Sequence, residues 1–351
     1  MLFLLPFYQL LHCFSPVILS MLTNWLFMVL LILGVTLSAF GGNLQLVAPA
    51  VQLTPAEAPS MWPFLFITIA CGAISGFHSL VSSGTSAKQV RNEKDTLFVG
   101  YGSMLLEGSL ATLVIIAVAA GIGMGYETES GVTLIGVEAW TSHYSSWAAA
   151  GGLESKITAF VDGAANMIGS VGIPKVISLV IMGVFVCSFA GTTLDTATRI
   201  QRYVITEIFS GFNFRILRNR YFTTFLAVAT AAILAFNSGA DGSGALKLWP
   251  LFGAINQTLA ALALIVITLY LKSKGGIKWI FSGIPAIFMS LITFWATIMN
   301  QTKFGAGPDH SILLQVVNAV IIVIVVWITI EGLIKFFSRS KKTETEAVSR
   351  V

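Results

Sequence analysis

The chain carries very little charge. Only 10% of its 351 residues are Asp, Glu, Lys or Arg, whereas soluble domains carry about 25%. Hydrophobic residues make up 56% of the chain, and the mean hydropathy is +0.84. This composition excludes an ordinary soluble domain and predicts an integral membrane protein.

Cysteine is also scarce. Cys13, Cys71 and Cys187 stand in apolar sequence without metal-ligand or redox spacing, so we expect buried apolar side chains, no metal and no cofactor. No basic run alternates with aromatic residues, which argues against nucleic-acid binding. The apolar N-terminus has neither a basic region nor a cleavage site, so we do not expect a removable signal peptide.

Long apolar runs are abundant. A span needs roughly 20 mostly apolar residues. The chain therefore predicts an all-α polytopic membrane bundle of about eight transmembrane helices, near residues 17–40, 62–83, 97–123, 174–194, 221–237, 247–271, 279–299 and 313–336.

Three further segments frame this bundle. Residues 1–15 are apolar but too short to span, and predict an interfacial helix or half of a span; residues 16–338 form the membrane domain, and 339–351 a polar cytoplasmic tail. Residues 159–174 predict a short helix, interrupted by glycine, that lies at the membrane surface or re-enters it.

The basic residues indicate an orientation. If both termini are cytoplasmic, sixteen of the twenty lysines and arginines fall on the inner side. Such an excess is typical of cytoplasmic loops. We therefore expect a multi-pass protein of the cell membrane with both ends inside.

A polar stripe crosses the second predicted span. Ser75, His78, Ser79, Ser82 and Ser86 recur at helical spacing, on a segment that begins as apolar sequence. Hydrocarbon offers such side chains no partners, so the stripe must face protein or a water-filled cavity. A substrate path is the functional interpretation, and its candidate residues are Ser75, Gly76, His78, Ser79, Ser82, Ser83 and Thr85.

Two titratable residues lie at membrane depth. Glu107 stands within the third span, beside Gly100, Ser103, Met104 and Ala111. It is either a neutral packing carboxyl or a proton-coupling group, since intramembrane acids are costly and rare. His78 is likewise either a satisfied buried histidine or part of a proton relay.

A cluster of hydroxyls and charges follows the fourth span. Thr192, Thr193, Asp195 and Arg199 stand where we expect the helix to meet the cytoplasm. Asp195 and Arg199 are spaced for a local ion pair. The cluster could instead form an inner gate or coordinate a cation through oxygen atoms.

The sixth span contains both a breaker and two amides. Pro250 and Gly253 predict a kink or break, and Asn256 with Gln257 follows at membrane depth. The amides serve either as hydrogen-bonding glue between helices or as part of a midplane binding site.

Four stretches resemble the carbon starvation protein A family of bacterial membrane transporters. They are PFLFITIACGAISGFHSLVSSGTSAK (63–88), YGSMLLEGSLA (101–111), FAGTTLDTATRIQRYV (189–204) and LWPLFGAINQTLAALAL (248–264), and the resemblance covers about 60–310. The resemblance implies uptake of peptides or pyruvate under carbon starvation, with proton-coupled symport for pyruvate. It also implies a distant relation to transporters of the amino acid–polyamine–organocation type.

One departure affects the functional prediction. Family members usually begin with additional spans that contain a GHHFAAIAGAGP-like motif, which this sequence lacks. We therefore expect either a secondary transporter for peptides or pyruvate, whose substrate path is lined by the polar stripe, or a truncated, inactive nutrient-binding subunit or sensor. An enzyme is not expected, because no Gly-x-Ser-x-Gly elbow or orienting acid accompanies His78.

Overall fold

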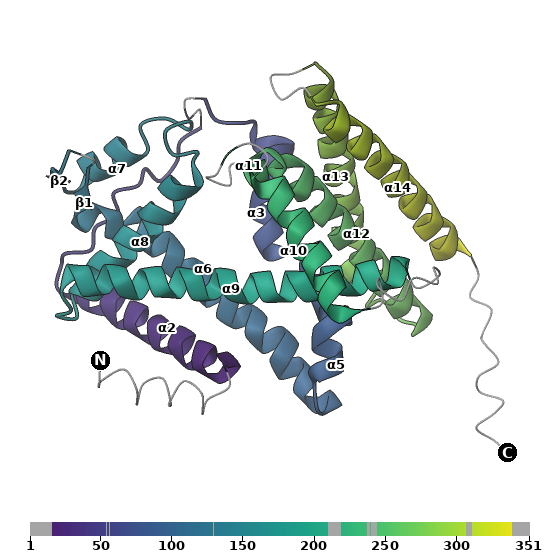
Figure 1. Cartoon of the computed structure of the whole chain (residues 1–351), viewed down its shortest axis with the longest axis horizontal. Helices are drawn as coiled ribbons and strands as arrows, with labels where there is room; N and C mark the ends of the chain where they lie inside the picture. Colours follow the sequence, from purple (N-terminus) through teal and green to yellow (C-terminus); the bar gives the residue numbers. More distant parts are fainter. Residues whose placement is uncertain are drawn as a thin grey trace. The chain divides into compact units, whose positions relative to one another are not determined.

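The computed structural model describes residues 16–338, apart from residues 54, 56, 129, 210–218, 237–238, 240–243 and 307–310. Residues 1–15 and the tail 339–351 lie outside the described part of the chain. Nearly every described element is a helix (Figure 1), and the chain divides into two compact units. The first unit joins the residues up to Ala58 to Val90–Ala197, and the second joins Pro59–Gln89 to Thr198 and beyond.

Within the described residues, six helical segments are long and apolar enough to cross a membrane. They are Met61–Gln89, Glu93–Met124, Lys175–Ile208, Trp249–Ser273, Ile280–Ala306 and Ile312–Phe337. The expectation of an all-α polytopic membrane bundle is thereby confirmed. The other two predicted spans are helical but shorter, at Asn24–Phe40 and Arg220–Phe236, so the number eight stays a prediction.

The first unit is built around four helices: α2 (Pro16–Phe40), α6 (Ser103–Ala119), α8 (Leu153–Gly169) and the first part of α9 (Lys175–Ile208). Their buried apolar side chains form one core. The other elements of the unit are the 3-10 turns Glu93–Asp95 and Gly121–Met124, the π-helical turn Phe98–Gly102, the paired strands β1 (Tyr126–Glu127) and β2 (Thr133–Leu134), and α7 (Val137–His143).

Helix α8 lies at the centre of this unit. It runs without a break through Gly163, and Met167 and Ile168 are fully buried in the core. The predicted glycine interruption is therefore wrong. The missing side chain of Gly163 serves packing instead, because a Cβ there would collide with the backbone oxygen of Ala117 on α6.

The second unit is organised by three long helices: α12 (Trp249–Ser273), α13 (Ile280–Ala306) and α14 (Ile312–Phe337), which lie side by side (Figure 1). The unit also contains α10 (Arg220–Phe236), α11 (Gly244–Lys247) and a segment composed of the π-helical turn Met61–Leu65, α3 (Phe66–Ala73), α4 (Gly76–Val81), the π-helical turn Ser82–Ser86 and α5 (Ala87–Gln89).

Polar bonds fix the antiparallel register of α12 and α13. Asn300 Nδ2 donates to the carbonyl oxygen of Pro250 (3.1 Å) near one end of the pair. At the other end, Thr268 Oγ1 donates to Ser282 Oγ (2.9 Å). Two turns inward from the first bond, Gln257 therefore lies level with Thr293.

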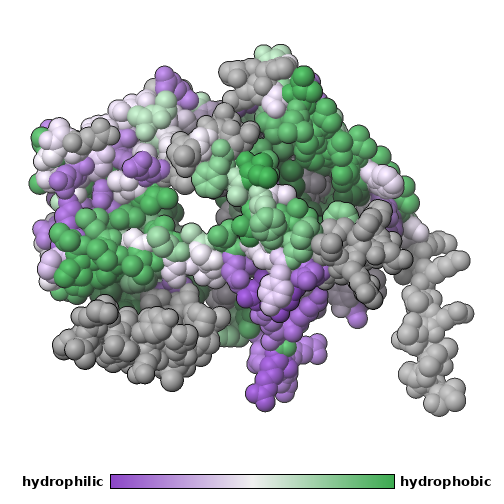
Figure 2. Space-filling view, viewed as in Figure 1, coloured by the Kyte–Doolittle hydropathy of each residue, from purple (hydrophilic) through white to green (hydrophobic). Residues whose placement is uncertain are grey.

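The outer face of α14 is apolar. Figure 2 shows hydrophobic side chains over this helix, and Val316, Val320, Val323 and Trp327 are more than half exposed. Such a face suits contact with lipid hydrocarbon, since a long helix exposing this many apolar side chains to water would be costly.

Candidate functional site

The second predicted span is broken in the middle. Helix α3 ends at Ala73 and α4 begins at Gly76, while Ile74 (φ −135°, ψ 104°) and Ser75 (φ −119°, ψ 128°) are extended. The expectation of a single helical stripe starting at Ser75 is therefore wrong. A break of this kind leaves backbone groups of both half-helices without intrahelical partners.

Asn256 of α12 satisfies the groups freed at the break. Its Oδ1 accepts hydrogen bonds from the backbone N–H of Phe77 (2.7 Å) and from Ser75 Oγ (3.2 Å), and its Nδ2 donates to Cys71 Sγ (3.0 Å). One buried amide thus holds the end of α3 and the start of α4. The expectation that Asn256 acts as interhelical glue is confirmed.

Gly76 brings α4 against the backbone of α12. A Cβ at this position would meet the carbonyl oxygen of Asn256 and, at 2.8 Å, the nitrogen of Ala260. Only a residue without a side chain fits so close an approach. The next amide, Gln257, is fully buried, donates weakly to the carbonyl oxygen of Ile67 (3.4 Å) and leaves its Oε1 without a partner.

The hydroxyl groups beyond the break bond back to their own helix. Ser79 Oγ donates to the oxygen of Gly76 (2.6 Å), and Ser82 and Ser83 both donate to that of Ser79 (2.9 Å each). These hydroxyls have used their protons, so they present acceptor lone pairs outward.

Two residues of the stretch differ from this pattern. Thr85 Oγ1 is buried without a partner within the π-helical turn Ser82–Ser86, a type of turn that is frequent at functional sites. His78 is exposed, so the alternative of a satisfied buried histidine is wrong within the described residues.

Glu107 lies on α6 in the first unit, and its side chain is exposed. Gly100, Ser103, Met104 and Ala111, its neighbours on the same face, are exposed as well. The described residues therefore do not supply the bundle packing that this small-residue face led us to expect. Ser103 Oγ donates to the oxygens of Val99 and Gly100, which occupies that hydroxyl.

The predicted gate lies on an uninterrupted helix. Helix α9 continues to Ile208, well beyond the predicted end of the span, so Asp195 and Arg199 do share one helix face. Thr192 and Thr193 are exposed and donate to the carbonyl oxygens one turn earlier, at 2.8 and 3.1 Å. Neither Asp195 nor Arg199 is without an interaction partner.

The interruption predicted beside Pro250 lies just before it, because α11 (Gly244–Lys247) ends one residue before α12 begins and Leu248 between them is a turn residue; no kink follows within α12. Helix α12 begins at Trp249, so Pro250 occupies its first turn, where a backbone N–H would have no intrahelical acceptor. The helix then continues without interruption through Gly253 to Ser273. The exposed backbone that we expected here lies instead at Ile74 and Ser75.

Sequence analysis missed a row of buried polar residues in the second unit. Thr293, Thr297 and Asn300 of α13 and Asn318 of α14 are fully buried. Asn318 Nδ2 donates to the oxygen of Thr297 and to Gln301 Oε1, both at 2.8 Å. The first three residues have helical spacing, so the periodicity that revealed the stripe at Ser75 would have found them too.

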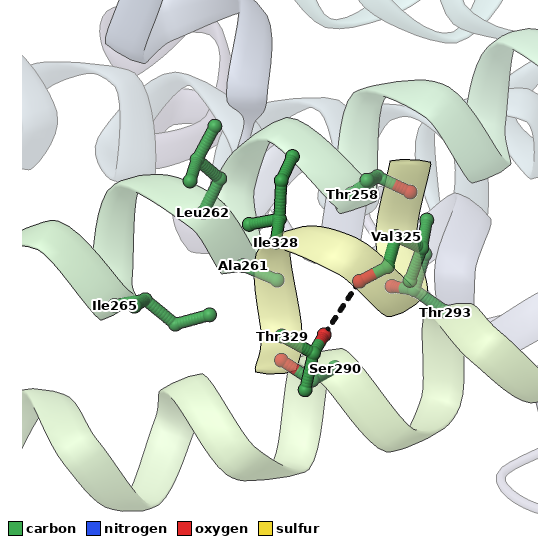
Figure 3. Close-up of a pocket in the computed structure, with 9 residues that line it drawn as sticks. All are labelled: Thr258, Ala261, Leu262, Ile265, Ser290, Thr293, Val325, Ile328 and Thr329. Carbon is green, nitrogen blue, oxygen red and sulfur yellow. Dashed lines mark hydrogen bonds between the residues drawn. The ribbon is translucent and has the colours of Figure 1, made fainter. Parts of the chain in front are cut away.

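A small cavity adjoins this row (Figure 3). It measures about 10 Å³, the size of one water molecule, and lies between α12, α13 and α14. Thr293 lines it with an unpartnered Oγ1, opposite Thr329, whose hydroxyl donates to the oxygen of Val325 (2.8 Å). None of the predicted site residues lines this cavity.

The cysteines also differ from expectation. Cys187 is exposed rather than buried, whereas Cys71 is half-buried and accepts the hydrogen bond from Asn256. Cys13 lies outside the described residues.

Another group missed from sequence lies beside the core of the first unit. Burial raises the pKa of Asp162 on α8, while the Lys175 ammonium opposes that rise and the Glu127 carboxylate adds to it. Lys175 Nζ lies 3.9 Å from Glu127 Oε2. Nearby, burial lowers the pKa of His143, whose Nε2 lies 3.3 Å from Ser155 Oγ.

These features define a class of protein. Six helices suited to a bilayer, one of them broken at Ile74–Ser75 beside a buried amide, describe a polytopic membrane protein with a discontinuous helix. In membrane proteins, non-helical backbone at membrane depth occurs where other protein segments or water satisfy it, and many secondary transporters are built this way.

Comparison with known proteins identifies the family. The family model described as "Carbon starvation protein CstA" matches residues 5–296. The chain therefore belongs to the carbon starvation protein CstA family, as its sequence motifs led us to expect.

Characterised relatives are transporters by name. The chain is 32% identical over 281 residues to the "Peptide transporter CstA" of Helicobacter pylori strain J99, covering 70% of this chain and 40% of that protein. It is 30% identical over 339 residues to the "Pyruvate/proton symporter BtsT" of Escherichia coli K12, covering 79% and 46%. These names agree with the prediction that the chain is not an enzyme.

The chain spans less than half the length of these relatives. No solved structure matches it.

Proposed function

We propose that this chain takes part in secondary active uptake of a small nutrient, a peptide or pyruvate, driven by protons across the bacterial cell membrane. The support is the family membership together with relatives named as a peptide transporter and a pyruvate/proton symporter. The termini would be cytoplasmic, in accord with the distribution of lysine and arginine.

The observation that carries the proposal is the break between α3 and α4. Its extended backbone at Ile74 and Ser75 is stabilised by hydrogen bonds to Asn256 of α12, so the break is a stable part of the fold. Backbone exposed at a helix break is a general way to bind small polar solutes at membrane depth. The substrate would contact the residues on and after the break: Ser75, Gly76, His78, Ser79, Ser82, Ser83 and Thr85, with Gln257 behind them.

The proton would be carried by Glu107 or His78. Both side chains are exposed within the described chain, and a carboxyl and an imidazole are groups that can accept and release a proton. Thr192, Thr193, Asp195 and Arg199 on α9 would contribute a gate, since they bring hydroxyl and charged groups to the second half of a long helix.

Uptake into proteoliposomes tests the coupling. We expect labelled pyruvate or dipeptide to accumulate when the outside is acidic. Glu107→Gln should reduce the uptake driven by the pH gradient by about tenfold or more. Glu138→Gln, an acid of α7 outside the six long helices, is the matched control and should respond as the native chain does. Uptake that ignores the gradient would remove the coupling.

A second function is a nutrient-binding subunit or sensor that does not transport. The break between α3 and α4 would serve binding alone as well as transport, since it needs only the extended backbone and the hydroxyl groups beside it. Equilibrium binding of the same labelled substrates separates the two functions. Binding without uptake would favour the sensor, whereas binding and uptake that are lost together in a Ser75→Trp variant would favour the transporter.

A further inference from the structure

A large groove lies in the second unit, between α12, α13 and α14. Its volume is about 420 Å³, within the range of sites that hold small ligands. Most of its wall is aliphatic or aromatic, with Ile265, Ile287, Leu291, Leu333 and Phe336 among the lining residues. It is distinct from the break between α3 and α4, whose residues do not line it.

The few hydroxyl groups in the groove are already bonded. Thr268 Oγ1 donates to Ser282 Oγ (2.9 Å), Ser290 Oγ donates to the oxygen of Ala286 (2.7 Å), and Thr329 Oγ1 donates to the oxygen of Val325 (2.8 Å). None of them needs a partner from a ligand. A peptide or pyruvate would therefore lose hydration here without compensation, whereas a hydrocarbon chain would lose nothing.

The two close helix contacts beside the groove depend on glycine. A Cβ at Gly332 would lie 2.8 Å from Ile265 Cγ2, and one at Gly283 would lie 3.3 Å from Thr268 Cγ2. These contacts bring the three helices close together, so the packing of the helices determines the shape of the groove.

One end of the groove is positively charged. Lys272 in the last turn of α12, and Lys274 and Lys278 in the connection to α13, are exposed, and no acidic residue occurs between Lys272 and Ser290. Lys272 Nζ donates to the oxygen of Phe336 and lies 3.6 Å from the centroid of its ring, so this cation touches the groove wall directly. Trp279, which follows Lys278, also lines the groove.

Among the described residues of α14, Glu331 is already paired with another lysine. Glu331 Oε1 lies 2.6 Å from Lys335 Nζ on α14. Lys272 donates to the oxygen of Phe336 and Lys274 lies over the ring of Tyr270, but neither contact neutralises the charge, so both lysines, with Lys278, can still attract an anion. The distribution of basic residues predicts that this end is cytoplasmic, where the bilayer carries anionic lipids.

We propose that this groove binds an anionic phospholipid, with one acyl chain along the apolar wall and the phosphate at Lys272, Lys274 and Lys278. Charge complementarity selects this occupant over a neutral lipid, because three cations at an apolar groove match a phosphate joined to a hydrocarbon chain. Trp279 sits where the wall meets the lysines, a position typical of tryptophan at the membrane interface.

Native mass spectrometry of the purified chain in detergent measures the preference. The probes are dioleoylphosphatidylglycerol and dioleoylphosphatidylcholine, which have the same acyl chains. The phosphate of phosphatidylglycerol carries a net negative charge that the headgroup of phosphatidylcholine lacks, so we expect phosphatidylglycerol to bind tighter by on the order of tenfold. Equal affinity for the two lipids would overturn the proposal.

Removing the charges tests the headgroup contact. We expect K272Q/K274Q/K278Q to lose the preference for phosphatidylglycerol and to keep the affinity for phosphatidylcholine. The matched control, K88Q/R91Q/K94Q, removes as many charges from another segment and should keep the preference. Equal losses in the two triple variants would show a general charge effect and overturn the site.

Filling the groove tests the acyl-chain contact. Ile287 lines the groove and is 62% exposed, so Ile287→Trp should fill it without disturbing the core and weaken binding of both lipids about tenfold. Ile284 is 65% exposed on the same helix but does not line the groove, so Ile284→Trp should leave binding unchanged. Equal effects of the two tryptophans would contradict the proposal.

Discussion

Two membrane segments of the second unit invite comparison. Met61–Gln89 and Trp249–Ser273 are each long, apolar and interrupted by small and polar residues. Sequence reasoning predicted a regular helix for the first and a kink for the second. In the structure the first is broken at Ile74–Ser75, whereas the second is continuous from Trp249 to Ser273, and its interruption lies at Leu248, before Pro250.

The difference shows what a helix break requires. A proline breaks a helix only where its missing N–H was needed, and Pro250 occupies a first turn where it was not. A helix can also break far from any proline, as at Ile74 and Ser75, if a neighbour accepts the freed backbone groups. Asn256 does so for Phe77, which means that the continuous helix stabilises the break in the other.

The largest expected effect comes from adding one methyl group at the break. In Gly76→Ala, the new Cβ would collide with the backbone of α12, which cannot yield as a side chain can. We expect the free energy of unfolding to fall by about 3 kcal/mol. Unfolding in mixed detergent micelles measures it, and Gly72→Ala, where nothing lies within 4 Å, is the matched control. Equal losses would show that the close approach has no special role.

A smaller effect is expected from removing the amide. Asn256→Ala leaves the N–H of Phe77 and the hydroxyl of Ser75 without their acceptor, at a cost of about 2 kcal/mol. Amide hydrogen exchange at Phe77 should become faster. Asn256→Asp keeps the acceptor oxygen and should protect that amide better than Ala does. Unchanged exchange in the alanine variant would mean that another group satisfies the break.

The smallest effect tests the continuous helix. Pro250→Ala should change the free energy of unfolding by less than about 0.5 kcal/mol, because the first turn of α12 needs no N–H at this position. Pro285, inside α13, provides the comparison: Pro285→Ala restores a donor within a helix and should change stability by about 1 kcal/mol or more. A large effect at Pro250 would revive the predicted hinge.

Much of the candidate site was accessible from sequence, but its geometry was not. Asn256 and the stretch from Ser75 to Thr85 could be selected because polar groups are costly in hydrocarbon. That Asn256 joins the break, while His78 and Glu107 remain exposed, depends on which helices pack together. The buried row at Thr293 and Asn300 was missed because each residue taken alone resembles ordinary polar glue.

The sequence by itself determined that this is a helical membrane protein of the CstA family, because apolar length and local motifs are properties of continuous segments. Only the tertiary structure decided where a helix breaks, which glycine is indispensable and which end of a groove is basic. Those features arise from contacts between residues far apart in the chain, such as Asn256 with Ser75 and Lys272 with Phe336. A backbone group gives up its own helix only when such a partner is in place.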